Sequence, residues 1–435
     1  MVDTEVAIGI FKKNNFNIVN NPREADIIVI NTCGFINSAK EEAINTILEM
    51  AEYKKKSCKY LIVMGCLAQR YAVELSKEFQ EVDLFIQLKE YDKFWQQIES
   101  VFAGNAEKIG NNNEKIINTK LPFFNEQDYL DKVITTGENY AYLKISEGCS
   151  NRCTYCAIPY IRGSLNSRKM EDILFEAEGL AKKGIKELIV IAQDTTKYGI
   201  DLYGEYKLPE LLEKLSKIEG IKWIRFLYSY PETISDELID VVKNNDKICK
   251  YFDIPIQHIA NPVLKRMNRR TTGEDIRKVI EKLRKNIPNV VIRTTVMVGF
   301  PGETEENFNE LFEFVKETKF NKLGAFMFSK EDGTPAEKLD GHLHHMTKKS
   351  RYNKIMSVQK EISKVLLEQN KGMEYDVLID GSSFDGKYLI GRTRMDVPEI
   401  DGVVYIKSCD KNLIGNFVKC KIVDVEEYDL VGEII

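Results

Sequence analysis

Apolar and polar positions follow two different periods along the first hundred residues. Apolar residues recur at a helical spacing over residues 3–16 and 39–55, whereas residues 26–31, 60–64 and 83–86 form short apolar runs of strand length. Strands that alternate with amphipathic helices predict a parallel sheet with helices on both faces. We therefore expect a doubly wound α/β domain over residues 1–103.

The same alternation resumes after a polar stretch that contains three consecutive asparagines at 111–113 and is predicted to be a linker over residues 104–134. The strand candidates that follow are residues 142–146, 187–191, 223–228, 251–255, 290–298 and 324–328. Repeated β/α units predict a partial TIM-like barrel over residues 135–366, with its chemistry at the C-terminal ends of the strands.

The last part of the chain changes pattern again. A long helix is predicted at 347–369, followed by short strands at 374–379, 388–391, 402–407 and 417–425 with Gly and Asp between them. Short strands separated by such turns predict a small β-barrel of the oligomer-binding kind over residues 369–435.

Composition and charge narrow the class of protein. The 435 residues are 43% hydrophobic and 30% charged, and the longest apolar runs are strand-sized, so we expect a cytoplasmic protein without a membrane span or a secretory signal. The net charge of −5 lies in residues 370–435, which hold 8 basic and 13 acidic residues. This imbalance favours a basic partner over RNA phosphates, although a solvated acidic surface is the simpler interpretation.

Three cysteines carry the clearest chemical signal. They occur in the segment CSNRCTYC at 149–156, directly after the first predicted barrel strand. Cys149, Cys153 and Cys156 can bind three irons of a [4Fe–4S] cluster and leave the fourth iron without a protein ligand. A structural zinc site would need a fourth Cys or His nearby, and the sequence offers none. An open iron at this position can bind S-adenosylmethionine (SAM) and donate the electron that generates a 5′-deoxyadenosyl radical.

Two further cysteines stand at the ends of predicted strands. Cys33 and Cys66 each neighbour a glycine at the C-terminal end of a strand, where doubly wound folds place ligand groups, so we expect both to bind metal. The other four cysteines are interpreted as structural or incidental: Cys58, Cys249, Cys409 and Cys420.

The CxxxCxxC pattern, with Tyr155 at the usual aromatic position, is that of the radical SAM superfamily. The two N-domain thiols and the C-terminal β-barrel make the chain resemble the methylthiotransferases over nearly its whole length. One branch of that family modifies an adenosine of transfer RNA (MiaB-like), and the other modifies an aspartate of a small-subunit ribosomal protein (RimO-like). The segments that resemble the RimO-like branch are CAIPYIRG at 156–163, AQDTTKYG at 192–199, DIPIQH at 253–258 and DVPEIDG at 396–402.

The resemblance implies a set of cofactors and partners. It implies two [4Fe–4S] clusters, SAM, a sulfur source, an electron donor and transfer of a methylthio group to the β-carbon of an aspartate in a basic ribosomal protein. It also suggests that Gln193, Gln257 and Arg293 point from strand ends toward SAM, although each could instead be a polar barrel or surface residue. We expect a monomer.

One departure from the family is serious. The family binds its auxiliary cluster with three N-domain cysteines. Here the first strand and the first cysteine are both absent, because the sequence given begins at the residues that normally follow them in the family. The sequence is interpreted as truncated at its start. If the truncation is real, the alternative is a non-catalytic, ribosome-associated iron–sulfur protein.

The segment at 396–402 contains three acidic residues, and we predict where their side chains lie. Asp396, Glu399 and Asp401 lie within six residues in a Gly-bounded loop. We expect them to face solvent and to attract the basic partner, so that their reversal to lysine would leave the barrel folded.

Overall fold

The computed structural model describes residues 1–105, 107–109, 116–137 and 139–435, so the asparagines at 111–113 lie outside the described residues. The chain forms two compact units. The first unit comprises Met1–Thr135, Ser146–Asp172 and Ser329–Glu337. The second comprises Thr136–Ile145, Ile173–Phe328 and Lys338–Ile435. Among the described helices, none is long and apolar enough to cross a membrane.

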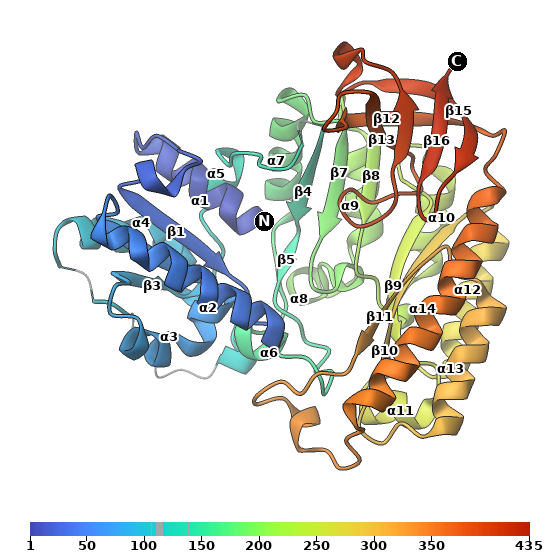
Figure 1. Ribbon diagram of the computed structural model, residues 1–435, viewed down its shortest axis with the longest axis horizontal. Helices are drawn as coiled ribbons and strands as arrows, with labels where there is room; N and C mark the ends of the chain where they lie inside the picture. Colours follow the sequence, from blue (N-terminus) through green and yellow to red (C-terminus); the bar gives the residue numbers. More distant parts are fainter. Residues whose placement is uncertain (106, 110–115, 138) are drawn as a thin grey trace. The chain divides into compact units, whose positions relative to one another are not determined.

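The first unit is built on a three-stranded parallel sheet in the order β1-β2-β3. Figure 1 labels its two outer strands, β1 and β3. Its strands are β1 (Ile27–Thr32), β2 (Tyr60–Gly65) and β3 (Leu84–Ile86). Its longer helices are α1 (Val2–Lys13), α2 (Asn37–Ala51), α3 (Cys66–Glu78) and α4 (Phe94–Phe102). Each strand lies within one residue of its expected position, because its apolar run begins directly after a charged residue.

Helices cover both faces of this sheet. Ala43 and Ile47 of α2 share a core with Leu61 and Val63 of β2. Successive strand residues point to opposite faces, so the buried Ile62 points to the other face. On α1 and α4, the rings of Phe11 and Trp95 meet edge to face, with centroids 5.7 Å apart. This arrangement confirms the predicted doubly wound domain.

Smaller elements surround the cysteine loop. The described part of the expected linker holds a 3₁₀ turn, η4 (Ile116–Asn118), and a short helix, α5 (Glu126–Leu130). Further along, β5 (Ser146–Glu147) pairs antiparallel with β6 (Asn166–Ser167), and α6 (Ile158–Ile161) lies between them. The β5–β6 pair closes a loop over residues 148–165.

The second unit contains six parallel strands in chain order. They are β4 (Tyr140–Lys144), β7 (Glu187–Ile191), β8 (Trp223–Phe226), β9 (Tyr251–Gln257), β10 (Val291–Val298) and β11 (Lys322–Met327). Strands β4, β7 and β8 form one hydrogen-bonded group, and β9, β10 and β11 form the other. The Ser229 amide donates to the Asp253 carbonyl at 2.8 Å and links the two groups. These strands confirm the predicted partial barrel.

Helices follow most of these strands along the chain. They are α7 (Met170–Lys182), α8 (Ile200–Tyr203), α9 (Leu208–Ser216), α10 (Asp236–Asn244), α11 (Asn261–Arg266), α12 (Gly273–Asn286), α13 (Glu305–Thr318) and α14 (His345–Glu368). Thr272 and Thr304 begin α12 and α13 with capping boxes. Each threonine side chain accepts a hydrogen bond from the backbone amide of the third helical residue, and that residue's side chain accepts one from the threonine backbone amide. The local sequence therefore determines where these two helices start.

The C-terminal strands close into a barrel in the order β12-β13-β14-β16-β15. They are β12 (Glu374–Ser382), β13 (Tyr388–Arg392), β14 (Val404–Lys407), β15 (Phe417–Val425) and β16 (Leu430–Ile434). Val377, Leu389, Ile406 and Ile422 fill its interior. The small β-barrel is confirmed, with β16 as a strand that the sequence pattern did not predict.

Residues 392–401, here called the docking segment, join this barrel to the starts of the parallel strands. The contacts are Tyr140 to Glu399 at 3.1 Å, Glu187 to Arg392 at 2.8 Å, Arg225 to the Arg394 carbonyl at 2.9 Å, Tyr251 to Asp401 at 2.7 Å, Arg293 to Asp401 at 3.8 Å and Lys322 to Asp396 at 2.7 Å. Each of the six parallel strands thus gives one polar side chain to the same ten residues.

The acidic loop is therefore not the solvent-facing surface that we expected. The side chains of Asp396 and Asp401 are only 7% and 3% exposed, because Lys322 and Tyr251 bind them. Glu399 is exposed, but its carboxylate accepts a hydrogen bond from Tyr140. The expectation was wrong for Asp396 and Asp401, and lysine at either position would place two cations together in a buried site.

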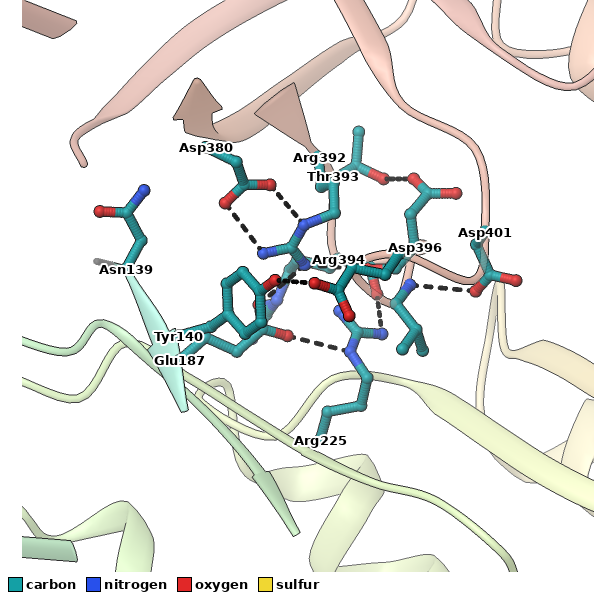
Figure 2. Close-up of polar contacts among 12 residues, drawn as sticks. Asn139, Tyr140, Glu187, Arg225, Asp380, Arg392, Thr393, Arg394, Asp396 and Asp401 are labelled. Atoms are coloured by element: carbon teal, nitrogen blue, oxygen red, sulfur yellow. Dashed lines mark hydrogen bonds and ion pairs between the residues drawn. The ribbon is translucent and has the colours of Figure 1, made fainter. Parts of the chain in front are cut away.

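A buried ionic cluster lies at the centre of this junction. Figure 2 shows the Arg392 guanidinium between Asp380 and Glu187. It pairs with Asp380 at 2.5 Å and with Glu187 at 2.8 Å. Glu187 also accepts from Arg225 at 3.0 Å, and both side chains of that pair are fully buried. Burial alone would raise the pKa of Glu187, but the two guanidinium groups outweigh it and lower that pKa below its usual value.

Candidate functional site

Cys149, Cys153 and Cys156 lie on the loop over residues 148–165 in the first unit. The Cys149 amide donates to the Gly163 carbonyl at 3.1 Å, and the Cys156 amide donates to the Cys153 carbonyl at 3.1 Å. Between them, Arg152 takes a positive φ of 58° and donates to the Ile117 carbonyl at 2.6 Å. Backbone bonds at both ends therefore hold the three thiols on one turn of chain.

The three thiols are sheltered from water and close to one another. Cys149 and Cys153 are buried, and Cys156 is half-buried. Burial raises the pKa of the Cys156 thiol, and the neighbouring Cys153 and Cys149 raise it further. Bound iron would reverse this balance because a metal stabilises the thiolate form. The chemistry of the donor set thus fits a cluster with three protein ligands.

Cys33 and Cys66 come together at the C-terminal edge of the first unit's sheet. Thr32 and Gly65 are partners in the β1–β2 ladder, so the two cysteines directly follow a matched pair of residues. Cys33 is exposed and Cys66 is buried at the first position of α3. The thiols are close enough that a negative charge on Cys33 raises the pKa of Cys66, after the larger effect of burial.

The structure does not bring a third cysteine to this pair among the described residues. Cys58 precedes β2, at the opposite end of the strand from Cys66, and its thiol donates to the Tyr60 carbonyl at 3.2 Å. No three His, Cys, Asp or Glu side chains in the described ranges converge tightly enough for a single metal ion. A [4Fe–4S] cluster does not require its ligands to converge on one ion, because each of its thiolates binds a different iron.

A segment distant in sequence from both cysteine loops forms hydrogen bonds with the chain beside each of them. Ser329–Glu337, here called the bridging segment, belongs to the first unit. Its buried Glu331 accepts from the Asn37 amide at 3.1 Å and pairs with Lys40 at 3.3 Å, just after Cys33. The Ala336 amide of the same segment donates to the Thr154 carbonyl at 2.9 Å, between Cys153 and Cys156.

Gly65 makes the sharp turn that presents Cys66. Its φ is +98°, and an added Cβ would lie 2.6 Å from the Thr32 carbonyl oxygen and still closer to the Asn31 side chain. We expect Gly65→Ala to lower the free energy of unfolding of the first unit by about 2–4 kcal/mol, since strain and a backbone clash add. Urea denaturation followed by Trp95 fluorescence in a Trp223→Phe background measures this change.

Gly104 offers a matched control for that variant. It has a φ of +72° in the same unit, but an added Cβ there would meet nothing within 4 Å. Gly104→Ala should therefore cost only about 1–2 kcal/mol, from the left-handed backbone alone. Equal losses in the two variants would show that the close approach of Gly65 to β1 is unimportant.

The residues predicted to contact SAM belong to different units. Tyr155 is half-buried on the cysteine loop in the first unit. In the second unit, Gln193 follows β7, and Gln257 is the last residue of β9, with a φ of 67°. Arg293 is the third residue of β10, and its guanidinium pairs with Asp253 at 2.8 Å. The SAM contacts of all four stay a prediction.

Sequence reasoning missed the polar residues around Cys66. Arg162 donates from Nη2 to the Cys66 sulfur at 3.3 Å and from Nη1 to Glu147 at 2.8 Å. Arg162 was visible only as a charged residue in the apolar segment that follows the cysteines. Its position 96 residues from Cys66 in the chain left no local signal of the contact.

Three family descriptions match successive parts of the chain. The uncharacterized protein family UPF0004 matches residues 1–87, the radical SAM superfamily matches residues 143–315, and the TRAM domain matches residues 372–435. Among solved structures, the chain is similar to the radical S-adenosylmethionine methyltransferase TsrM from Kitasatospora setae, with a TM-score of 0.56 and 12% identity over 76% of this chain and 73% of that one. This likeness concerns the fold.

Curated relatives match over essentially the full length. Proteins named ribosomal protein uS12 methylthiotransferase RimO are 60% identical in Alkaliphilus oremlandii, 50% in Acetivibrio thermocellus and 48% in Clostridioides difficile. Each alignment covers 100% of this chain and 96% of the relative. Identity at this level, together with the order of the three matching regions, establishes the family. The chain belongs to the RimO family of radical SAM methylthiotransferases.

Proposed function

We propose that this enzyme transfers a methylthio group to the β-carbon of an aspartate in ribosomal protein uS12. The observation that carries the proposal is the loop with Cys149, Cys153 and Cys156, in a chain whose relatives at 48–60% identity are named for that activity. The uS12 name of the relatives also supports work in the cytoplasm, where ribosomes are modified. The sulfur source and the electron donor are further partners, and we propose a monomer.

We assign the radical cluster to Cys149, Cys153 and Cys156. Membership of the radical SAM superfamily implies a [4Fe–4S] cluster and SAM. When bound, the cluster supplies an iron position for SAM and the electron that cleaves its C–S bond. The protein's part is to supply three thiolates, to keep them out of water and to hold the loop by the Cys149 and Cys156 backbone bonds.

We propose that Cys33 and Cys66 supply two of the three cysteine ligands of a second [4Fe–4S] cluster, whose third ligand is lacking among the described residues. Their shared position at the sheet edge supports this assignment, because both follow paired strand residues. The bridging segment also supports it, since it fixes the chain beside Cys33 to the chain between Cys153 and Cys156. A reaction that uses sulfur at one cluster and a radical at the other needs the two loops in a fixed relation.

We propose that SAM contacts Tyr155, Gln193, Gln257 and Arg293. Gln193 and Gln257 stand at the C-terminal ends of their strands, where barrel enzymes bind substrates. Arg293 is the weakest of the four, because it already pairs with Asp253 and lies 3.8 Å from Asp401.

The proposed domains are residues 1–103, 135–366 and 369–435, with a linker at 104–134. The matches at 1–87, 143–315 and 372–435 support this division. With Asp396 and Asp401 buried, we propose that exposed acidic residues on the barrel strands meet basic uS12, such as Glu374 on β12 and Glu433 on β16. Both lie beside Lys421 of β15 in the barrel sheet.

The proposal is tested with reconstituted full-length chain, SAM, a reductant, sulfide and purified uS12. We expect a mass increase of one methylthio group on uS12, about eight irons per chain and 5′-deoxyadenosine as co-product. Transfer RNA from cells that lack methylthioadenosine serves as the competing substrate. Product on transfer RNA would move the enzyme to the other branch of the family. About four irons and no product on either substrate would support the non-catalytic iron–sulfur protein.

A further inference from the structure

A cavity of about 390 Å³ lies in the second unit, where the C-terminal barrel meets the parallel strands. Its walls come from the first halves of β10 and β11, the second half of α14, the docking segment and the turn between β15 and β16. Barrel chemistry takes place at the C-terminal ends of parallel strands, so this cavity is at the opposite end of β10 and β11.

One side of the cavity is apolar and its mouth is open. Apolar side chains from α14, β11, the docking segment and β16 line it: Leu323, Met356, Leu366, Leu367, Met395 and Leu430. Ile400 and Tyr428 also line it, and they are 45% and 44% exposed. The cavity can therefore admit an apolar chain from solvent between these two residues.

Gly324 leaves part of this space empty. It lines the cavity as the third residue of β11, two positions after Lys322, so the two residues belong to the same face of the strand. An added Cβ at Gly324 would meet nothing within 4 Å, and its φ is not positive. The backbone there would accept a side chain, so a larger residue could fill the cavity.

Carboxylates outnumber cations among the described residues that line the cavity. The carboxylates are those of Asp396, Asp401 and Asp429, and the cations are Lys322 and Arg293. Lys322 pairs with Asp396 at 2.7 Å. Arg293 lies closer to Asp253, at 2.8 Å, than to Asp401, at 3.8 Å. Burial alone would lower the pKa of Lys322, but the three carboxylates raise it above its usual value. The walls therefore favour a positively charged occupant.

Two acceptors in these walls lack a donor among the described residues. One is Oδ2 of Asp429, whose Oδ1 accepts from the Val403 amide at 2.8 Å. The other is the buried Oε1 of Gln359, whose Nε2 donates to the Phe320 carbonyl at 2.9 Å. Buried acceptors in native proteins almost always have a partner, so Gln359 is an independent indication that a donor binds here.

We propose that this cavity binds one arginine side chain of a basic partner protein, with its aliphatic stem on the apolar wall and its guanidinium as donor to Asp429 and Gln359. Arginine fits better than lysine, because a guanidinium has five donors and is less strongly hydrated than an ammonium group. An arginine in a desolvated pocket is also a common anchor of protein interfaces. The identity of the partner as uS12 rests on the proposed function.

The test uses two probes on the reconstituted full chain. Fluorescently labelled uS12 reports binding of the whole partner by anisotropy. N-acetylarginine amide is small enough to enter the cavity alone, and saturation-transfer NMR reports its contact with the protein. N-acetylcitrulline amide has nearly the same shape without the charge, and N-acetyllysine amide has the charge without the fork. We expect signal transfer to the arginine probe, less to the lysine probe and none to the citrulline probe.

Gly324→Leu tests the cavity by filling it. It should abolish transfer to the arginine probe and weaken uS12 binding by about tenfold or more, as the loss of an anchor pocket does. Gly381→Leu is the matched control. Gly381 is a strand glycine of β12, where an added Cβ also meets nothing within 4 Å and φ is not positive, but it does not line the cavity. It should keep both signals at the level of the parent.

Asp429→Asn tests the charge, because asparagine keeps an acceptor for the Val403 amide. It should weaken uS12 binding by about three- to tenfold. Asp424→Asn is its control, since Asp424 accepts from the Val425 amide at 2.9 Å in the same barrel, outside the cavity. It changes the net charge equally and should weaken uS12 binding by about twofold or less, because exposed charges are screened.

The outcomes separate this inference from the proposed function. Failure of the parent to modify uS12 would refute the proposed function, whereas transfer to the arginine probe that Gly324→Leu abolishes would still support the cavity. A parent that modifies uS12, with a Gly324→Leu variant that binds uS12 and the arginine probe equally well, would overturn the inference alone. Equal transfer to the arginine and citrulline probes, or equal losses in the two glycine variants, would overturn it as well.

Discussion

Alanine at Cys149, Cys153 or Cys156 should reduce the formation of 5′-deoxyadenosine from SAM to background. Each thiolate anchors one iron, and a cluster that lacks one of them loses both its attachment and its single open iron. The measurement is chromatographic quantification of 5′-deoxyadenosine after reduction of the reconstituted chain. Iron content should fall by about four per chain in the same samples, because one complete cluster is lost.

Cys58→Ala is the control for this series. Cys58 is a buried cysteine of the same unit, and its thiol bonds to the Tyr60 carbonyl at the end of β2 far from Cys66. It should keep the iron content and SAM cleavage of the parent. Parent-level 5′-deoxyadenosine from any of the three single alanine variants would contradict the assignment of the radical cluster.

Removal of Arg392 should cause the largest loss of stability in the second unit. Arg392→Met would leave Asp380 and the fully buried Glu187 without their shared cation, which costs about 3–5 kcal/mol in comparable buried pairs. Trp223 reports this loss directly, because its ring meets Phe417 of the C-terminal barrel with centroids 4.8 Å apart. Urea denaturation followed by Trp223 fluorescence in a Trp95→Phe background is the measurement.

Lys387→Met provides the comparison for that substitution. Lys387 pairs with Asp385 in the same barrel, but both side chains are largely exposed, so its loss should cost less than about 1 kcal/mol. The lowered pKa of Glu187 adds a pH dependence with a definite sign. Its contribution is present above the usual pKa of 4.5 and should disappear as the pH falls below it, so that parent and Arg392→Met converge in acid. A loss below 1 kcal/mol for Arg392→Met at neutral pH would contradict the role of this cluster.

The regular elements were predictable because their signals are local. Strands β7 and β15 occupy the expected residues, since each is an uninterrupted apolar or alternating run between turns. The two-residue strands β5 and β6 were missed, because such short segments carry no periodicity. They pair only because the cysteine loop folds back on itself.

The residues of the site also fall into those that the sequence could predict and those that it could not. The three cysteines at 149–156 could be recognised from the sequence, because their characteristic spacing falls within eight residues. The contact of Arg162 with Cys66, the contact of Lys322 with Asp396 and that of Tyr251 with Asp401 join residues 96, 74 and 150 positions apart. Such pairs arise from the tertiary fold, so a run of acidic residues such as 396–401 was interpreted as surface when two of its members are buried.

The docking segment has a consequence for how such enzymes could exchange parts during evolution. The C-terminal barrel has a complete core of its own, and its five strands close without help from the parallel strands. Its recognition of the parallel strands, in contrast, resides in residues 392–401, which meet one side chain from each of six strands. If a barrel from another protein replaced this one, its strands would fold. Its connecting segment would lack the contacts that residues 392–401 make with the six parallel strands. The heritable module is therefore the barrel together with this segment and its six strand partners, and recombination that separates them should yield chains whose two halves fold but do not assemble.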